Sequence, residues 1–90
     1  MLFGVFPDGD HVEIDVTISL KKGVADPEGA NTKKALNLLG FDNVRNVRVM
    51  KTFRIEIDTE NEKKARAEIA EMCEKLLANP VIQDYTITIR

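Results

Sequence analysis

The chain has 90 residues, a formal net charge of −2 and an apolar share of 43%, which together limit the classes of protein it can belong to. A chain of this length forms one domain near the lower size limit for a self-sufficient core, so association with another subunit is a natural way to gain stability. The net charge gives no sign of the basic excess that nucleic-acid-binding proteins usually carry to hold phosphates.

Residues 1–10 follow no regular pattern and are expected to be an N-terminal extension of unknown role, ahead of a single domain at 11–90. Several apolar side chains there would gain from burial, but Gly4 and the turn-forming residues 7–10 interrupt them. The segment fits a short strand paired with the next one, an arm on a neighbouring subunit, or a frayed tail. It lacks the regions of a signal peptide, and no apolar run approaches the roughly 20 residues of a membrane span.

Residues 12–20 predict a half-buried β-strand. Apolar and polar side chains alternate throughout, the apolar set being Val12, Ile14, Val16, Ile18 and Leu20. One face of this strand is therefore expected to pack on the core, and the other to stay polar.

A turn and a well-capped helix are expected next. Residues 21–23 form the turn, and Asp26 is a good N-cap because its carboxylate can accept hydrogen bonds from the first helical turn. Pro27 suits the first helical position, where a missing N–H costs nothing, and Gly40 is expected to end the helix. Gly29 is a poor helix former and indicates close backbone packing, or an anion near the helix start.

Two further strands are predicted, one over residues 44–49 from its three valines and one over residues 53–57, where apolar side chains alternate with polar ones. To keep the apolar side chains on one face, the connection has to be an odd-numbered loop, such as residues 50–52, or a bulge. We therefore expect an irregular hairpin with Arg48 near Arg54 on the outer face. Acidic side chains or an acidic partner would offset the repulsion between the two arginines.

The second helix is the most clearly marked element of the sequence. Residues 59–62 read as a capping box, with Thr59 as the N-cap and Glu62 reaching back from the third helical position. The expected apolar stripe consists of Ala65, Ile69, Met72 and Leu76, widened by Cys73 and Leu77. Residues 79–80 end the helix, and alternation resumes over residues 85–89 in a final strand.

The predicted order is strand, helix, strand, strand, helix, strand. Such an order favours a two-layer α+β sandwich, ferredoxin-like or a relative of it, with the helices on one face of a mainly antiparallel sheet. The other face is polar and carries Thr17, Ser19, Thr86 and Thr88. That face is expected to be either exposed to solvent or covered by another subunit.

The sequence contains no recognisable catalytic or metal-binding constellation. His11 is the only histidine, and no neighbouring residues combine into a nucleophile–base pair. One histidine and one cysteine fit no zinc spacing, so neither a metal nor another cofactor is expected. Cys73 falls on the apolar stripe and is expected to be a small buried side chain rather than a reactive thiol. A lone cysteine excludes an internal disulfide and fits a reducing cytoplasm.

Basic residues are the remaining candidates for a binding surface. Residues 21–23 precede a capped helix, as in phosphate-binding loops, but the Walker pattern is absent and a structural turn is favoured. Arg48, Lys51 and Arg54 gather around the predicted hairpin, where a solvated rim and a partner contact are the alternatives. An RNA-binding module of this strand order would carry aromatic side chains on its open sheet face. In this sequence the aromatic side chains of the predicted strands alternate together with the core residues, so they are expected on the core face.

Two segments resemble the PurS family, the small subunits of the glutamine-dependent phosphoribosylformylglycinamidine (FGAM) synthase of purine biosynthesis. They are residues 20–29, with the sequence LKKGVADPEG, and residues 71–85, with the sequence EMCEKLLANPVIQDY. The spacing between them also matches, and the resemblance extends over about residues 12–90. A Met-Lys pair at 50–51 replaces the usual Gly-Lys, and residues 1–10 extend beyond the usual start.

The resemblance implies a PurS-like α+β fold without an active site of its own. In such a complex a large synthetase subunit (PurL) binds formylglycinamide ribonucleotide and ATP, and a glutaminase subunit (PurQ) releases ammonia. PurS-like proteins form dimers or higher homo-oligomers that help bring these two subunits together and aid the passage of ammonia. The chain is thus expected to be a non-catalytic, cytoplasmic subunit of a ligase complex.

Contacts with these partners are expected on the loop before the first helix and on the predicted hairpin. The candidate contact residues are Lys21, Lys22, Gly23, Asp26, Pro27, Arg48, Lys51 and Arg54. The main alternative is a regulatory α+β domain that binds a small molecule at a dimer interface. A small stand-alone enzyme that uses His11 or Cys73 is the second alternative, and neither nucleic acid nor a membrane is expected as a partner.

Overall fold

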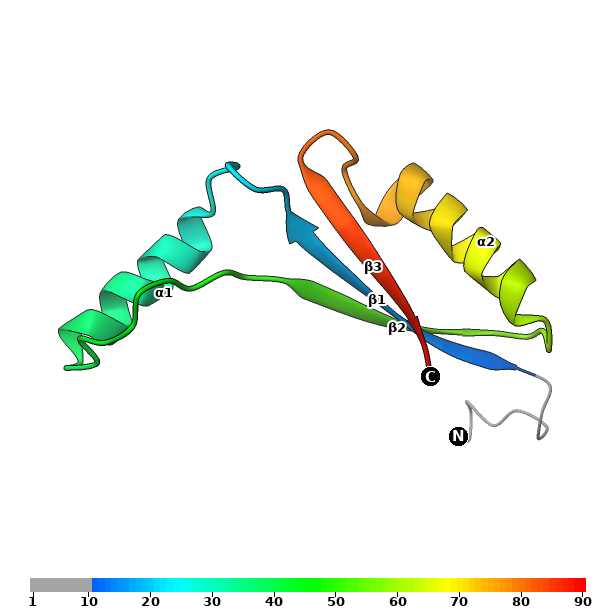
Figure 1. Cartoon of the computed structure of the whole chain (residues 1–90), viewed down its shortest axis with the longest axis horizontal. Helices are drawn as coiled ribbons and strands as arrows, with labels where there is room; N and C mark the ends of the chain where they lie inside the picture. The colour runs from blue at the N-terminus through cyan, green and yellow to red at the C-terminus, as the bar shows by residue number, and fades with distance from the viewer. Residues whose placement is uncertain (1–10) are drawn as a thin grey trace.

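The computed structural model describes residues 11–90, in which strands and helices alternate (Figure 1). The elements are β1 (Val12–Leu20), α1 (Pro27–Leu38), β2 (Lys51–Ile57), α2 (Glu62–Met72), η1 (Cys73–Leu77) and β3 (Gln83–Ile89). The predicted strands at 12–20, 53–57 and 85–89 are confirmed. The alternatives weighed for residues 1–10 lie outside the described residues.

The three strands form one antiparallel sheet with β1 in the centre, in the order β2-β1-β3. Val16 of β1 lies opposite Phe53 of β2 and Ile87 of β3, and this register places the apolar side chains of all three strands on one face. On the other face, the hydroxyl groups of Thr17 and Thr52 share a hydrogen bond of 2.9 Å. The prediction of one apolar and one polar face is therefore confirmed.

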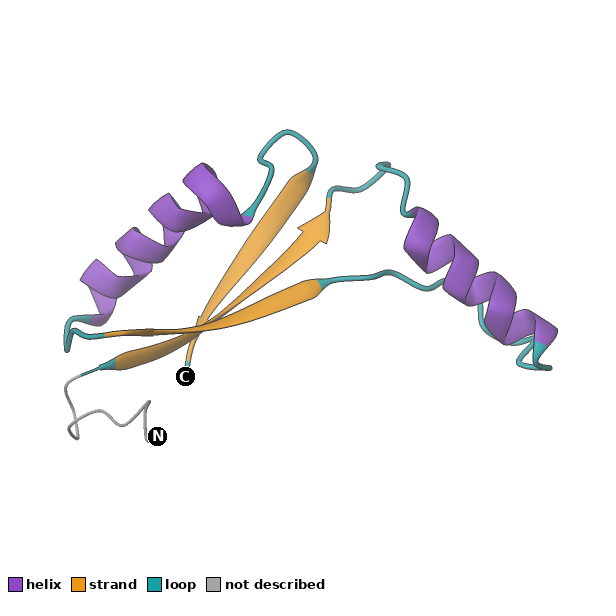
Figure 2. Cartoon of the chain, turned by 180° about the vertical axis from the view of Figure 1, so that it is seen from behind, coloured by secondary structure: helices purple, strands orange, loops and turns teal. Residues whose placement is uncertain are grey.

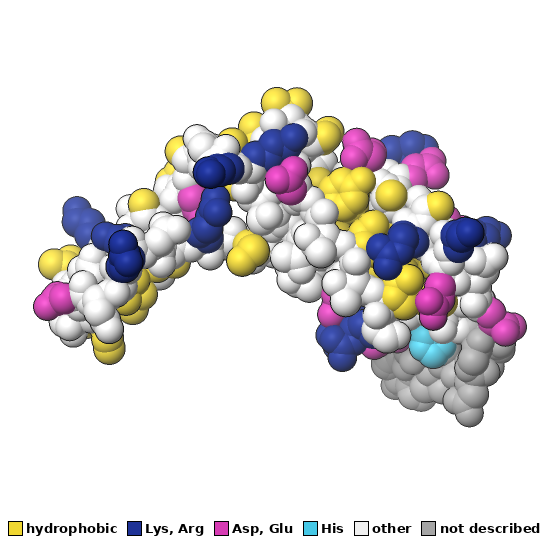
Figure 3. Space-filling view, in the orientation of Figure 1, with side chains coloured by type: hydrophobic (Ala, Val, Ile, Leu, Met, Phe, Trp, Pro, Cys, Tyr) yellow, Lys and Arg dark blue, Asp and Glu magenta, His cyan; other side chains and the backbone are white. Residues whose placement is uncertain are grey.

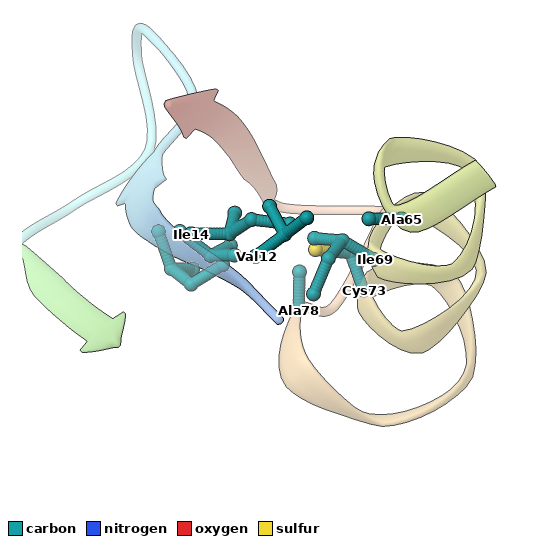
Figure 4. Close-up of a cluster of buried hydrophobic side chains, with 8 residues drawn as sticks. Val12, Ile14, Ala65, Ile69, Cys73 and Ala78 are labelled. Carbon is teal, nitrogen blue, oxygen red and sulfur yellow. The ribbon is translucent and has the colours of Figure 1, made fainter. Parts of the chain in front are cut away.

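The hydrophobic core lies between the apolar face of the sheet and α2 (Figure 4). Ile14 and Val16 of β1 are fully buried there, together with Ile69 of α2 and Cys73. Each large buried side chain contributes about 1.5–3 kcal/mol. Because α2 contacts β3 and β1 but hardly touches β2, the edge strand β2 is only half covered.

Helix α2 departs from the sequence prediction at both ends. Its N-cap is Asn61, whose side chain accepts a hydrogen bond of 3.0 Å from the N–H of Lys64. The predicted capping box is therefore wrong, and Thr59 instead accepts a hydrogen bond from the N–H of Asn61. At the other end, α2 continues into the π-helical turn η1, which is wider than an α-helical turn. Leu77 consequently packs against the core, whereas Leu76 is 82% exposed and does not belong to the buried stripe.

Helix α1 begins and ends as predicted. Asp26 is the N-cap and Pro27 occupies the first turn, with Glu28 complementing the positive end of the helix dipole. The helix ends at Leu38 with Leu39 as its C-cap, after which Gly40 adopts a φ of +101°, a conformation that favours glycine.

Helix α1 does not cover the sheet. Together with the segment that returns to β2, it forms an arm, residues 27–50, that projects away from the sheet (Figures 1 and 2). The radius of gyration of 17.2 Å exceeds the value of about 12 Å expected for a compact domain of this length. The α+β class and the antiparallel sheet are confirmed, but the placement of both helices on one sheet face is wrong for α1.

The segment 44–49, predicted as the second strand, has no strand partner in the described chain. Because β2 starts only after this segment, the predicted hairpin that places Arg48 near Arg54 is wrong. The segment lies instead against the first turn of α1, where the N–H of Val49 donates a hydrogen bond of 2.9 Å to Asp26. The valines of residues 44–49 thus belong to the arm and not to the sheet.

Replacing Gly29 with alanine tests the packing of the returning segment on α1. A Cβ at this position would overlap the carbonyl oxygen of Val47 and lie 2.8 Å from a carboxylate oxygen of Asp26. Helix propensity alone predicts stabilisation by about 1 kcal/mol. The overlap predicts destabilisation by about 1–3 kcal/mol, which we expect to observe in urea unfolding.

Asn31→Ala, at an exposed position of the same helix, is the matched control. It is expected to stabilise the protein slightly, by less than about 1 kcal/mol. A Gly29→Ala variant more stable than the wild type would contradict the close packing of Val47 on the helix start.

Candidate functional site

Asp26 is the centre of the candidate contact surface. One carboxylate oxygen accepts a hydrogen bond of 2.9 Å from the N–H of Gly29, and the other accepts one of 2.9 Å from the N–H of Val49. The hydrogen bond from Val49, then the one from Gly29, and the charge of Arg48 lower the pKa of this carboxyl group. The charged form of Asp26 therefore caps α1 and joins the helix start to the end of the arm.

A shallow cavity of about 210 Å³ opens beside Asp26, where the arm leaves the sheet. Lys51 lines this cavity, and Arg48 lines an adjoining hollow that also reaches Asp26. The ammonium of Lys51 lies 5.7 Å from the ring centroid of Phe53, a cation–π contact. The structure thus brings three of the predicted contact residues together at the root of the arm, with Pro27 next to them in the sequence.

The turn before α1 holds the other predicted lysines. The N–H of Val24 donates a hydrogen bond of 3.1 Å to the carbonyl of Lys21, and Gly23 has a φ of +88°. The ammonium of Lys21 is 3.9 Å from the carboxylate of Asp84, whereas the side chain of Lys22 is exposed. Lys22 is therefore better placed than Lys21 to contact another subunit.

Arg54 lies on the polar face of the sheet, in a network away from the arm. Its Nε and Nη2 donate hydrogen bonds of 2.8 and 3.0 Å to the two carboxylate oxygens of Asp15. Arg90 donates a further bond of 3.1 Å to Asp15 and lies 3.6 Å from the carboxylate of Glu13. The network joins all three strands, so Arg54 serves the sheet and is not part of the cluster around Asp26.

Exposed apolar side chains on the arm are the feature that sequence reasoning missed. Leu38 and Leu39 are 79% and 73% exposed, and Phe41 is 54% exposed. Figure 3 shows hydrophobic side chains gathered at the free end of the arm. The sequence shows that Leu38, Leu39 and Phe41 are apolar, but it carries no information about whether anything covers them. The only sequence signal was the small size of the chain, which favours association.

Cys73 and His11 are the residues of the stand-alone-enzyme alternative. Cys73 is fully buried, as predicted, and burial raises the pKa of its thiol. His11 lies half-buried directly before β1. Within residues 11–90 no group of acidic, histidine or cysteine side chains could hold a metal ion, and no helix is long and apolar enough to cross a membrane.

Acid unfolding tests the network around Asp15. The hydrogen bond from Arg54 is the main cause that lowers the pKa of Asp15 from 3.8 to about 2 in the folded chain. Its stabilising contribution is therefore complete above pH 3.8 and is lost as the pH falls through about 2. In urea unfolding across this range, we expect the stability of Asp15→Asn to depend less on pH than that of the wild type.

Glu60→Gln removes an exposed carboxylate outside the network and is the matched control. Its dependence on pH should follow that of the wild type. Equal pH dependence of Asp15→Asn and the wild type would contradict the role assigned to this carboxylate.

The sequence matches a known family over nearly its whole described length. The family model "PurS: Phosphoribosylformylglycinamidine (FGAM) synthase" matches residues 13–90. The phosphoribosylformylglycinamidine synthase subunit PurS of Archaeoglobus fulgidus is 62% identical over 76 residues, which cover 84% of this chain and 95% of that protein.

Solved structures agree with this match. The crystal structure of Methanocaldococcus jannaschii PurS, a subunit of formylglycinamide ribonucleotide amidotransferase, has a TM-score of 0.80 at 52% identity and covers 88% of this chain and 95% of that one. A chain in the structure of PurLQS from Thermotoga maritima has a TM-score of 0.82 at 26% identity, covering 89% of this chain and 98% of that one. The chain therefore belongs to the PurS family of FGAM synthase subunits.

Proposed function

We propose that the chain is the assembly subunit of an FGAM synthase, holding a PurL-type synthetase and a PurQ-type glutaminase together in purine biosynthesis. The observation that carries this proposal is the match to a chain of the Thermotoga maritima PurLQS structure over 89% of the chain. The complex would use ATP to transfer the amide nitrogen of glutamine to formylglycinamide ribonucleotide. In this proposal the chain, with residues 11–90 as its single domain, works in the cytoplasm.

The chemistry of the described residues supports a role without catalysis. The only cysteine is buried in the core, and its thiol has a raised pKa, so it is poorly suited to act as a nucleophile. The strongest perturbation of an acidic group, at Asp15, results from a cross-strand ion pair. The chain thus contributes contact surface to the complex, and the passage of ammonia between the two enzymes is aided by the position in which it holds them.

We place the partner contacts at the arm root, with Lys22, Pro27, Arg48 and Lys51 as its exposed members and Gly23 and Asp26 as residues that shape it. All four exposed side chains are available to another subunit. Lys21 and Arg54 contribute less in this proposal because each already pairs with a carboxylate of the chain.

Reconstitution tests the assembly role. Purified PurL-type and PurQ-type subunits should form FGAM from glutamine at least about tenfold more slowly without the chain, because the two enzymes lose their high effective concentration. Formation of FGAM from added ammonium chloride, which bypasses the glutaminase, is the control and should not depend on the chain. Equal glutamine-dependent rates with and without the chain would contradict the proposal.

Charge reversal tests the placement of the contact surface. Lys22→Glu should weaken co-purification of the two partner subunits, because it turns an exposed cation at the arm root into an anion. Lys75→Glu, on the exposed side of η1, is the matched control and should leave co-purification unchanged. If both variants retain the partners equally well, the contact surface lies elsewhere.

A further inference from the structure

The cavity at the arm root has apolar walls that come from three parts of the chain. Ile18 and Leu20 of β1 line it from the sheet, Leu77 lines it from η1, and Val49 and Met50 line it from the end of the arm. Met50 is 58% exposed and Val49 is 37% exposed, so the arm side of the cavity is open to another molecule. The chain thus has an apolar hollow within the surface where we place the partner contacts.

Both walls of this cavity are held in place by contacts within the chain. On the arm side, Asp26 accepts hydrogen bonds of 2.9 Å from the N–H groups of Gly29 and Val49. On the sheet side, Ile18 is 4% exposed and belongs to the core, and Leu77 packs against the same core. A hollow that is formed in advance costs little ordering of the chain when a side chain enters it.

Two basic side chains at the opening have no acidic partner. Lys51 lines the cavity, and Arg48 lines the hollow that adjoins it. Neither takes part in the ion pairs formed within residues 11–90, whereas Lys21 and Arg54 each pair with a carboxylate. The ammonium of Lys51 lies instead 5.7 Å from the ring centroid of Phe53. Positive charge is therefore available directly beside the apolar hollow.

The acidic side chains of the cavity leave this charge available. The carboxylate of Asp26 is occupied by two backbone N–H groups, and although the charge of Arg48 is one cause of its lowered pKa, the two side chains form no ion pair. Glu28 lies in the first turn of α1, where it complements the helix dipole. An incoming carboxylate can thus pair with Lys51 or Arg48 without displacing an existing ion pair.

From this geometry we infer that the cavity receives one large apolar side chain from a partner enzyme, and that an acidic residue beside it in the partner pairs with Lys51 or Arg48. The inference deepens the proposed function and rests on it, because it names the chemistry of the segment that binds the arm root. A cavity of about 150 Å³ is enough for one benzene ring, and this one has about 210 Å³. A single anchoring side chain in such a pocket supplies a large share of the binding free energy of many interfaces.

Charge favours a partner enzyme over a second copy of the arm as the occupant. Residues 27–50 carry four Lys and Arg residues against two Asp and Glu residues. A second arm would therefore bring a net positive charge to an opening that already holds two unpaired cations, which opposes its binding. An acidic segment of another protein meets no such repulsion.

Methyl NMR of the chain in the reconstituted complex is the first part of the test. The chain has three methionines, of which Met50 lines the cavity and Met72 packs against the core. In a deuterated chain with ¹³C-labelled methionine methyl groups, unlabelled PurL-type and PurQ-type subunits should shift the Met50 signal and transfer saturation to it. The Met72 signal is the internal control and should stay unchanged.

Filling the cavity from the side of the chain is the second part. Val49→Trp places an indole in the hollow and should raise the dissociation constant for the partner enzyme at least about tenfold. Val81→Trp, at a valine that is 79% exposed and lines none of the cavity, is the matched control and should bind as the wild type does. Circular dichroism checks that both variants are folded.

Removing the two cations tests the charge and does not depend on packing. Arg48→Gln with Lys51→Gln changes two exposed side chains and should also weaken binding at least about tenfold. Binding of this variant should depend less on salt than that of the wild type, because an exposed ion pair is screened.

Three results would overturn the inference. They are a Met50 signal that the partner enzymes leave unchanged, a Met50 signal that shifts when the chain alone is concentrated, and a folded Val49→Trp variant that binds as tightly as the wild type. The second result would assign the cavity to a second copy. The proposed function is judged separately, by the glutamine-dependent rate of the reconstituted complex. A chain that supports this rate but gives one of these results keeps its assembly role and loses only the anchoring cavity.

Discussion

The carboxylate of Asp26 sets the shape of this chain. It accepts hydrogen bonds from the N–H groups of Gly29 and Val49, which joins the first turn of α1 to a residue 23 positions away. The absence of a side chain at Gly29 lets the carbonyl of Val47 approach the same turn. With both contacts at the root, the arm continues outward from β1 and β2, whereas a crossover helix in a two-layer sandwich would lie across the sheet.

This arrangement leaves the chain with one helix for a three-stranded sheet. The core between α2 and β1 is well formed, with Ile14, Val16 and Ile69 fully removed from water. The edge strand β2 stays half-covered, and Leu38, Leu39 and Phe41 at the end of the arm stay exposed, in a chain already near the lower limit for a stable core. Small chains with a partly covered core commonly gain stability from association, and the family to which this chain belongs consists of FGAM synthase subunits.

Local features of the sequence were sufficient for the strands and for the start of α1. Alternation over residues 12–20 predicted β1, and the pair of Asp26 and Pro27 predicted the capped helix, because both signals act within a few residues. The valines of residues 44–49 wrongly predicted a strand, since they indicate a half-buried extended segment and not whether a partner strand exists. Local patterns also could not tell which candidate contact residues lie together in the fold. Arg48 and Lys51 meet near Asp26, whereas the pairing of Arg54 with Asp15 depends on a cross-strand register that no local pattern shows.

Small-angle X-ray scattering of a Leu38→Asp, Leu39→Asp variant measures the central claim most directly. The two charged side chains at these exposed positions disfavour burial of the arm against another molecule, so the scattering reports the position of the arm in a single chain. If the contacts of Asp26 and Gly29 hold the arm outward without a partner, the monomer will have a radius of gyration of at least the 17.2 Å of the structure. A value near the roughly 12 Å of a compact chain of this length would mean that the arm folds back onto its own sheet, and would contradict the account.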